Sequence, residues 1–476
     1  MNYRDRAFLA CMAGIAAALL SACGGTGGND GASAGINGGG RDIAQGPISG
    51  FGSVVVNGVR FETTGATIVI DGVTSTEAGL ATGLVVRVEG RTEAAGQSGR
   101  ADRIVHESAV RGPVQAVDLS LMKLTVLGQT VLATKDTILS GFGSSGSFDA
   151  VRTGDLVSIS GFVNAAGENV ATRIALQNNV SLFGVAGPIS AIDSTLRRFR
   201  INALTVDYAS AVLEGFAGAA PTIGQQVSIK GSTNLQGGIL VATNVSLGEP
   251  GVPAAIGDSV DVAGLVTRFA SASDFDVSGQ RVTTSAATQF VGGSASGIAI
   301  DAQLDVRGQR NAAGALVAER IEFLPVSNVV IEATLEGIDS TAGTLRLVGI
   351  DVITNSRTRY DDDDDRTFGF ANLRTGDSVQ IAGYVQASRF VATRVSRDDD
   401  GGTDVEIEGP VTDLAAPAFR IGGVAITTNA QTEFESEGSG SPGAAGFFAT
   451  ALGRNAEVEG TWNGAAVLAL EVEIED

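Results

Sequence analysis

Hydrophobic and polar positions alternate along most of the chain. From about residue 44 to the C-terminus, short runs with an apolar residue at every second position are separated by glycine-rich turns. The run at 170–176 is a clear example, because Val170, Thr172, Ile174 and Leu176 share one face. A period of two is typical of strands that bury one face and expose the other. The pattern predicts an all-β protein with no helix after the first 22 residues.

The same order of strand motifs recurs six times, with a period of about 66 to 77 residues. Each copy opens with a strand that contains a glycine, such as Gly112, and continues with a hairpin that is clearest at Asn57-Gly58. A strand bounded by two glycines follows, as at 154–161, and an alanine such as Ala171 opens the last strand. The predicted repeats, numbered 1 to 6, are 44–109, 110–181, 182–249, 254–325, 326–400 and 401–476.

Each repeat is expected to form a small closed sheet. About five short strands fit into some 70 residues, and a glycine inside an alternating strand marks the bend that lets a small sheet curl. The best-known small barrel of this kind is the OB-fold. Propeller blades are shorter, and one Trp with four Tyr cannot supply the aromatic girdles of an outer-membrane barrel. We therefore predict a tandem array of six five-stranded, OB-like β-barrels behind a signal peptide and a flexible tether.

The N-terminus has the pattern of an export signal. Arg4 and Arg6 precede an apolar stretch, 7–20, that is too short to span a bilayer stably. The stretch ends in Leu20-Ser21-Ala22-Cys23, which resembles the bacterial lipobox. The prediction is a lipoprotein signal peptide over 1–22 and acylation of Cys23; an ordinary export signal is the alternative. The resemblance and the glycine at position 24 imply the outer membrane, with the periplasmic or surface-facing side left open.

Two stretches separate the predicted units. Residues 23–43 are rich in glycine and cannot bury enough surface to fold, so they are expected to form a flexible tether. Pro250 and Pro253 form the only proline-rich junction between repeats, between the third and fourth copies. This junction predicts an arrangement of three repeats followed by three.

Together these motifs resemble a known family. The glycine-bent first strand, the Val-x-Val-x-Gly hairpin, the Gly-x-x-Val-x-Val-x-Gly strand and the closing Ala-x-Arg-Ile strand, all behind a lipobox, are similar to the repeated bacterial lipoprotein domain known as domain of unknown function 5666. The resemblance extends over 46–475. It implies an architecture and carries no activity, cofactor or catalytic residue.

Composition excludes several chemistries. The 476 residues include one His and two Cys, so imidazole catalysis, thiol catalysis and Cys/His metal sites have almost no side chains to use. The formal net charge of −21 disfavours nucleic acid as a partner. His106, near the end of the last strand of repeat 1, is expected to fill the mouth of its barrel.

Two runs of aspartate in repeat 5 are the most conspicuous candidate site. One run covers 361–365 and the other covers 398–400. Close carboxylate oxygens suit Ca²⁺, but the chain has no EF-hand loop. The runs are interpreted either as a solvated acidic loop or as a weak Ca²⁺ site. The candidate ligands are Asp361, Asp363, Asp365, Asp398 and Asp400.

Two classes of function remain. The first is a lipid-anchored cell-envelope protein that acts without catalysis, as a spacer or as a binding or adhesion module. Its partners would be the membrane, through acylated Cys23, and an envelope or surface protein or polymer. The alternative is a carboxylate-dependent hydrolase that acts on an envelope polymer. No catalytic or cofactor-binding residue is assigned.

Overall fold

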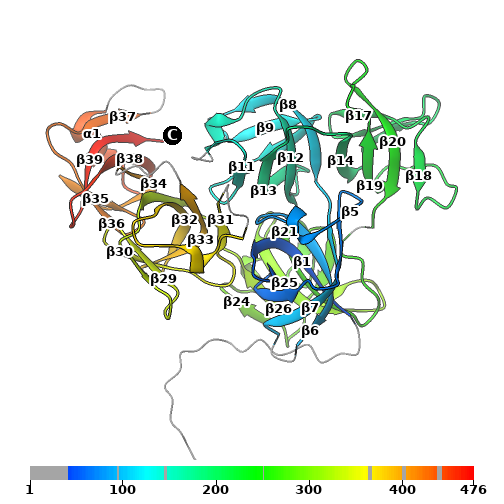
Figure 1. Ribbon diagram of the computed structural model, residues 1–476, viewed down its shortest axis with the longest axis horizontal. Helices are drawn as coiled ribbons and strands as arrows, with labels where there is room; N and C mark the ends of the chain where they lie inside the picture. The colour runs from blue at the N-terminus through cyan, green and yellow to red at the C-terminus, as the bar shows by residue number, and fades with distance from the viewer. Residues whose placement is uncertain are drawn as a thin grey trace, which may run out of the picture. The chain divides into compact units, whose positions relative to one another are not determined.

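The computed structural model describes residues 41–93, 96–143, 147–249, 251–362, 367–398, 404–436 and 442–475. These residues form an all-β protein with six repeats (Figure 1). Repeat 1 comprises β1 (Asp42–Gly50), β2 (Val54–Val56), β3 (Val59–Glu62), β4 (Thr67–Ile70), β5 (Val73–Ser75), β6 (Val85–Thr92) and β7 (Ser98–His106). Repeat 2 comprises β8 (Val110–Asp118), β9 (Lys123–Val126), β10 (Gln129–Leu132), β11 (Ile138–Ser140), β12 (Leu156–Val163) and β13 (Asn169–Leu176).

The two middle repeats follow the same order. Repeat 3 comprises β14 (Phe183–Pro188), β15 (Ala191–Asp193), β16 (Arg198–Ile201), β17 (Leu204–Asp207), β18 (Val212–Glu214), β19 (Gln226–Gly231) and β20 (Ile239–Leu247). Repeat 4 comprises β21 (Ser259–Ser271), β22 (Asp274–Val277), β23 (Gln280–Thr283), β24 (Gln289–Val291), β25 (Gln303–Arg310) and β26 (Leu316–Phe323).

The last two repeats again keep this order. Repeat 5 comprises β27 (Val329–Thr334), β28 (Gly337–Asp339), β29 (Thr344–Leu347), β30 (Ile350–Ile353), β31 (Arg359–Asp361), β32 (Ser378–Gln386) and β33 (Arg389–Asp398). Repeat 6 comprises β34 (Asp404–Ala415), β35 (Ala418–Ile421), β36 (Val424–Thr427), β37 (Glu433–Ser436), β38 (Asn455–Trp462) and β39 (Val467–Ile474).

Five strands close into a ring in repeats 1, 2, 4 and 6, as the sequence predicts, whereas in repeats 3 and 5 the first strand is divided in two, into β14 and β15 and into β27 and β28. In repeat 2, β8 pairs with β9, β9 with β10, β10 with β13, β13 with β12, and β12 with β8. Only the β10–β13 pair is parallel. A further strand, β11, adds in parallel to β13, and β24, β31 and β37 do the same in repeats 4, 5 and 6. These added strands have three or four residues, too few for an alternating pattern to identify them.

Alternate side chains of the ring fill its interior. In repeat 2, Leu124, Val126, Val157, Ile159 and Ile174 are fully buried. A continuous buried cluster joins repeats 2 and 3, and another joins repeats 5 and 6. Small domains bury a limited share of their surface, so joining two barrels extends a core that one copy alone supports poorly.

The repeats pair through the free edges of their first strands. β8 pairs with β14, and β27 pairs with β34, so repeats 2 and 3 and repeats 5 and 6 share sheets. Repeats 1 and 4 are joined by the parallel pair β1–β21, with 42–45 alongside 259–262. The predicted division into three plus three is therefore wrong. The first strand of repeat 4, beyond the proline-rich junction, covers the open edge of repeat 1, and such edges require a partner.

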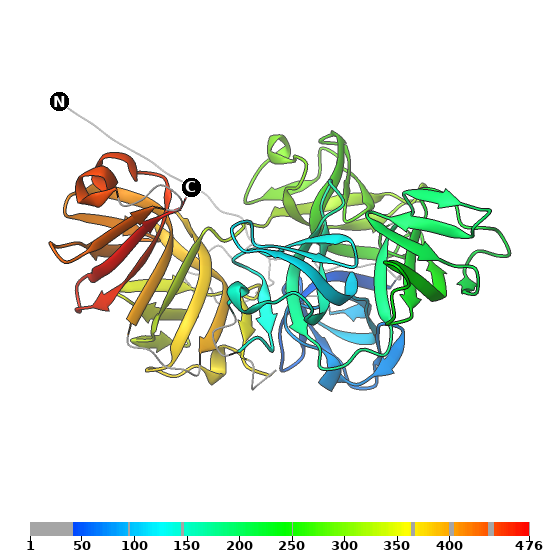
Figure 2. The same cartoon turned by 90° about the horizontal axis from the view of Figure 1, so that it is seen from above.

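One short helix differs from the sequence prediction. α1 (Gly443–Thr450) lies between β37 and β38, where the sequence pattern predicts no helix; Figure 2 shows it in orange-red against the strands of repeat 6. The ring of Phe447 is fully buried and packs against Phe419 and Phe434, at centroid distances of 5.0 and 5.3 Å. Tertiary burial of this aromatic side chain stabilises a helix too short to persist alone.

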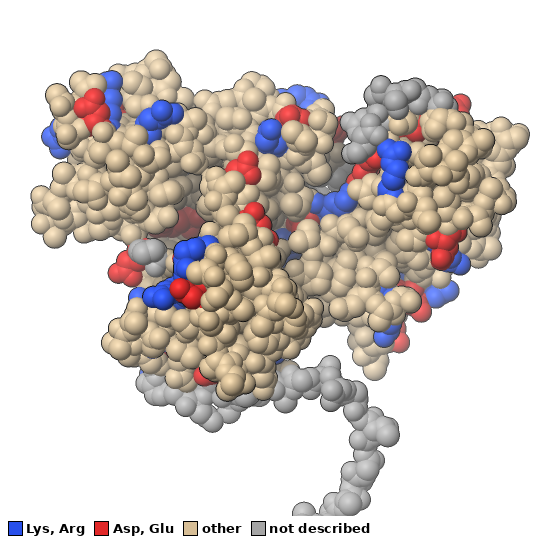
Figure 3. Space-filling view, turned by 180° about the vertical axis from the view of Figure 1, so that it is seen from behind, with Lys and Arg blue, Asp and Glu red and all other residues tan. Residues whose placement is uncertain are grey.

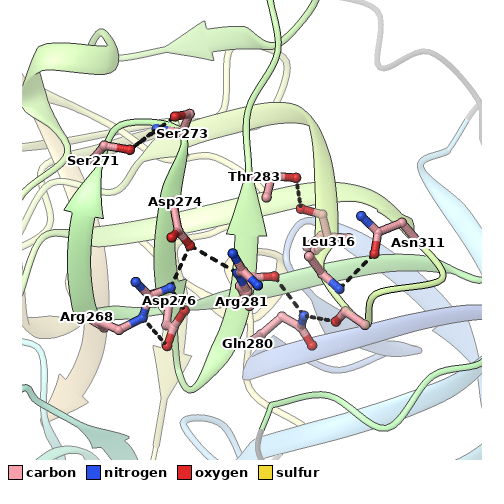
Figure 4. A network of polar contacts seen from close by, with 12 residues as sticks. Arg268, Ser271, Ser273, Asp274, Asp276, Gln280, Arg281, Thr283, Asn311 and Leu316 are labelled. Carbon is pink, nitrogen blue, oxygen red and sulfur yellow. Dashed lines mark hydrogen bonds and ion pairs between the residues drawn. The ribbon is translucent and has the colours of Figure 1, made fainter.

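Exposed ion pairs support one hairpin of repeat 4. Figure 4 shows Arg268 of β21 reaching Asp276 of β22 with two hydrogen bonds, of 2.9 and 2.7 Å, and Asp274 with one of 2.8 Å. Hydrogen bonds from Arg268 and Arg281 lower the pKa of Asp274. Surface pairs of this kind contribute little to stability. They lie on the outside of the barrel and are not part of the candidate site.

Candidate functional site

A cavity of about 520 Å³ lies among repeats 1, 2, 4 and 5. Ser49, Asp136, Leu265 and Arg359 illustrate the contribution of each repeat in that order. The volume falls within the range of about 300 to 1,000 Å³ typical of small-molecule sites. The cavity therefore has the size of a ligand site and depends on four barrels rather than on one.

A turn motif found in four repeats places side chains at this cavity. Its first residue, Asn, Ser or Thr, donates its main-chain N–H to the hydroxyl of a Thr three positions later, at 2.8 to 3.0 Å. That hydroxyl donates in turn to the main-chain oxygen of the alanine in the last strand, at 2.7 to 2.9 Å. The motif covers 134–137, 285–288, 355–358 and 429–432.

The third position of the turn carries charged side chains in two repeats. It is occupied by Asp136 in repeat 2 and by Arg357 in repeat 5, and both line the cavity. In repeat 5, Asn355, Arg357 and Arg359 alternate along the chain and all face the cavity, while Thr358 between them is buried against β33. The turn thus fixes the main chain and leaves these side chains directed at the space between repeats.

Asp136 connects repeat 2 to repeat 5. Its carboxylate accepts hydrogen bonds from the main-chain N–H of Ser327, at 3.1 Å, and from the Ser327 hydroxyl, at 2.8 Å. It also accepts from the hydroxyl of Thr393 and pairs with Nη2 of Arg359 at 3.5 Å. These contacts hold the half-buried carboxylate between the two repeats.

Arg359 retains donors that no protein group occupies. The residue is only 8% exposed and lines the cavity. Within the described residues its guanidinium makes one ion pair, with Asp136, although it carries five N–H donors. Burial lowers the pKa of Arg359 from its usual value. The side chain is therefore a buried cation beside a cavity, with hydrogen-bonding capacity to spare.

A second polar network lies behind the cavity, where repeats 1, 4 and 5 meet. Asn57 donates to Oδ1 of Asp261 at 2.8 Å, and Arg357 contacts Asp305. The carboxyls of Asp261 and Asp305 are close enough to shift each other's pKa. Burial and the negative charge of Asp305 raise the pKa of Asp261 well above its usual range, while Arg357 holds the pKa of Asp305 low. Of the two carboxyls, Asp261 therefore holds a proton more readily.

The aspartate run in repeat 5 is buried where it is described. The carboxylate of Asp361, at the end of β31, pairs with Nη1 of Arg173 from repeat 2 at 3.4 Å, and Asp362 pairs with Arg397. Burial raises the pKa of Asp361. These two residues are not part of a solvated loop, because Arg173 of repeat 2 and Arg397 of the neighbouring strand β33 pair with them.

The structure does not describe the side chains of the remaining predicted ligands. Asp363, Asp365 and Asp400 lie outside the described residues, as does the side chain of Asp398. Within the part of the chain that the structure describes, no group of three or more His, Cys, Asp or Glu side chains is placed to hold a metal ion. The Ca²⁺ site stays a prediction.

Of the other residues predicted from the sequence, some lie within the described residues and some lie outside them. Cys23 and the predicted signal peptide lie outside the described residues. His106 is 3% exposed, and its Nδ1 lies 2.9 Å from the main-chain oxygen of Val85, as expected for a structural residue. Among the described residues, no helix has the length and apolar character needed to cross a membrane.

The cavity residues were not predicted from the sequence. The signal that identifies them is the Asn/Ser/Thr-x-x-Thr spacing before the added short strand, as at 134–137 and 355–358. The spacing becomes informative only when its Thr is seen to bond to the alanine of the last strand. The spacing does not indicate which other repeats lie opposite the turn.

These features define a class of protein, a tandem array of small closed β-barrels. The model of a family described as a domain of unknown function (DUF5666) matches the chain six times. The matched residues are 45–105, 111–175, 186–246, 263–322, 331–396 and 408–473. The chain belongs to this family. No curated protein matches the chain.

Proposed function

We propose that this protein is a lipid-anchored, non-enzymatic binding module of the cell envelope. Acylated Cys23 would hold it at the outer membrane, with residues 23–43 as a tether. The repeats, which we propose to be OB-like, would present the cavity among repeats 1, 2, 4 and 5 to a ligand. The observation that carries the proposal is this cavity, because it exists only through the joint packing of four copies.

Contacts between non-consecutive repeats favour a binding module over a spacer. Repeat 1 pairs with repeat 4 through β1 and β21. Asp136 links repeat 2 to repeat 5, and Lys135 of repeat 2 pairs with Glu408 of repeat 6. A spacer needs only contacts between sequence neighbours, as in solenoid repeats. Long-range contacts shorten an array and gain nothing for spacing, whereas they are required to enclose a shared cavity.

The paired carboxyls do not favour a hydrolase. Asp261 is 8% exposed and Asp305 is 5% exposed. Arg357 and Asn57 occupy their oxygens from the cavity side. A glycosidase pair must flank a scissile bond that reaches both carboxyls. This pair instead joins repeats 1, 4 and 5 below the cavity wall.

Two measurements test the proposal. The first is the mass of the N-terminal peptide from cells, which should carry acyl chains on Cys23 and lose them in Cys23→Ser. The second is native mass spectrometry of the protein isolated from envelopes. A bound small molecule should be retained by the wild type and lost when Val291→Trp fills the cavity.

Val317→Trp is a matched control for the second measurement. Val291 and Val317 are 38% and 37% exposed and both belong to repeat 4, but only Val291 lines the cavity. Equal ligand retention by the two variants would refute a binding role for the cavity. An unmodified Cys23 on protein from cells would refute the anchoring.

A further inference from the structure

The carboxylates that line the cavity are already bound by protein groups. Asp136 accepts from Ser327 and pairs with Arg359. Glu322 pairs with Arg357 at 3.0 Å and with Arg320 at 2.9 Å. Asp301 accepts from the main-chain N–H of Ala165 at 2.8 Å. A cationic ligand would have to displace one of these partners, so the cavity does not favour cations.

Arg359 belongs to a cluster of guanidinium groups. Arg173, Arg359 and Arg394 gather around Asp136 and Asp361. Glu332 is connected to Arg394 through Gln380. Nε of Arg394 is buried without a hydrogen-bond partner within the described residues. A guanidinium with open donors beside a cavity attracts an anion more strongly where water is scarce than on an exposed surface.

This cluster differs from the exposed surface. The chain as a whole has 53 acidic and 32 basic residues. On the face shown in Figure 3, side chains of both signs lie in small mixed groups between larger uncharged areas. Arg359 is the arginine of the cluster that lines the cavity, and its open donors are a local property that net charge does not reveal.

The opposite wall is apolar. Phe162 and Leu265 are buried at the cavity, and 323–326 supply a continuous apolar segment between repeats 4 and 5. Val326 in that segment is 53% exposed, and Val291 at the end of β24 is 38% exposed. Apolar surface left in water is unfavourable in proportion to its area, so an apolar ligand gains by covering this wall.

We propose that the cavity binds a monocarboxylate with an apolar body. The carboxylate accepts hydrogen bonds from the free N–H groups of Arg359, and the apolar body covers the wall formed by Phe162, Leu265 and 323–326. This inference rests on the proposed function, because it names the ligand class of the same cavity. It also explains why a buried arginine retains unused donors.

Three probes of equal length test the ligand class. Decanoate, decanol and decylamine differ only in the head group, and each fits a cavity of about 520 Å³. Binding is measured by equilibrium dialysis with the full chain carrying Cys23→Ser, which cannot be acylated. A charge-assisted hydrogen bond is worth about 1.5 to 3 kcal/mol, so decanoate should bind at least about tenfold more tightly than decanol. Decylamine should bind most weakly.

Two variants assign the preference to this cavity. Val291→Trp should weaken decanoate and decanol alike, and Val317→Trp should change neither. Arg359→Met should remove the preference for decanoate and leave decanol binding unchanged, which a purely structural role of Arg359 would not produce. The comparison of the three probes on the unmutated cavity remains decisive if the Arg359 variant fails to fold.

The outcomes separate this inference from the proposed function. If all three probes bind equally and Val291→Trp weakens them, the cavity is a binding site and the assignment of a monocarboxylate is wrong. If none binds, or if Val291→Trp changes nothing, both the ligand class and the use of this cavity are refuted.

Discussion

Replacement of Asp136 by Asn tests whether repeats 2 and 5 are held together by one carboxylate. The side chain of Asp136 is 16% exposed and accepts from the main-chain N–H and the hydroxyl of Ser327 and from the hydroxyl of Thr393, besides pairing with Arg359. Asn keeps the shape and one acceptor oxygen. It replaces the other oxygen with an amino group that faces donors.

The expected cost follows from these contacts. A hydrogen bond to a charged group contributes about 1.5 to 3 kcal/mol, and at least one donor loses its acceptor. Arg359 also loses its ion pair while it stays buried, and removal of one partner from a buried pair costs about 3 to 5 kcal/mol. Because Asn retains part of the network, we expect a loss of about 3 kcal/mol at the contact between repeats 2 and 5.

Amide hydrogen exchange at Ser327 measures this loss locally. Its N–H donates to Asp136, so a cost of about 3 kcal/mol should speed exchange of that amide about 100-fold. Asp149→Asn, an exposed change in the same repeat, should leave it unaltered. Adding Arg359→Met to Asp136→Asn should recover part of the loss, because it removes the unpaired cation. An acceleration below threefold would refute the role assigned to Asp136.

Four substitutions probe repeat 6. Phe447→Ala should cost about 3 to 5 kcal/mol in denaturant unfolding because its ring is fully buried, and Phe448→Ala should cost less because its ring is partly exposed. Thr432→Val should cost about 1 to 2 kcal/mol, because it leaves a turn N–H and a strand carbonyl without their partner. Partial burial and the negative charge of Glu457 raise the pKa of Glu406 to about 7. The thermal midpoint of the protein should therefore fall as pH rises from 5 to 8. The fall should be smaller in Glu406→Gln, which has no carboxyl to titrate at this position.

The sign of the pH effect follows from proton binding. The folded protein holds a proton on Glu406 at pH values where the unfolded chain has lost it, so stability declines from the unfolded pKa, near 4.5, up to about 7. Thr461→Val and Glu249→Gln, at exposed positions, serve as controls. A thermal midpoint that rises with pH over this range, or equal costs for the two Phe variants, would contradict the packing described for repeat 6.

The strand pattern predicted the barrels because the information is local. Alternating residues such as Val157 and Ile159 specify a buried face, and Gly161, which closes the same strand motif, lies where the register to β13 shifts. Neither feature depends on another repeat. The helix around Phe447 was missed because its stability comes from aromatic rings on other strands.

Contacts between repeats could not be predicted in the same way. The carboxylate of Asp361 and its partner Arg173 are 188 residues apart, and nothing near either residue indicates the other. The aspartate run was therefore interpreted as exposed to water or calcium. A period-two pattern likewise indicates which face of a strand is buried without naming β21 as the strand that pairs with β1.

Repetition and a cavity shared by four repeats are compatible because the turns keep one main-chain geometry and differ in their side chains. The four turns of the Asn/Ser/Thr-x-x-Thr type have the same hydrogen bonds, yet their third residues are Asp136, Ala287, Arg357 and Gln431. Only the two charged members line the cavity. Both reach other repeats from a position that the hydrogen bonds of the turn leave free, because Asp136 contacts Ser327 of repeat 5 and Arg357 contacts Asp305 of repeat 4. Side chains at such a position can therefore join repeats without any change to the barrels themselves.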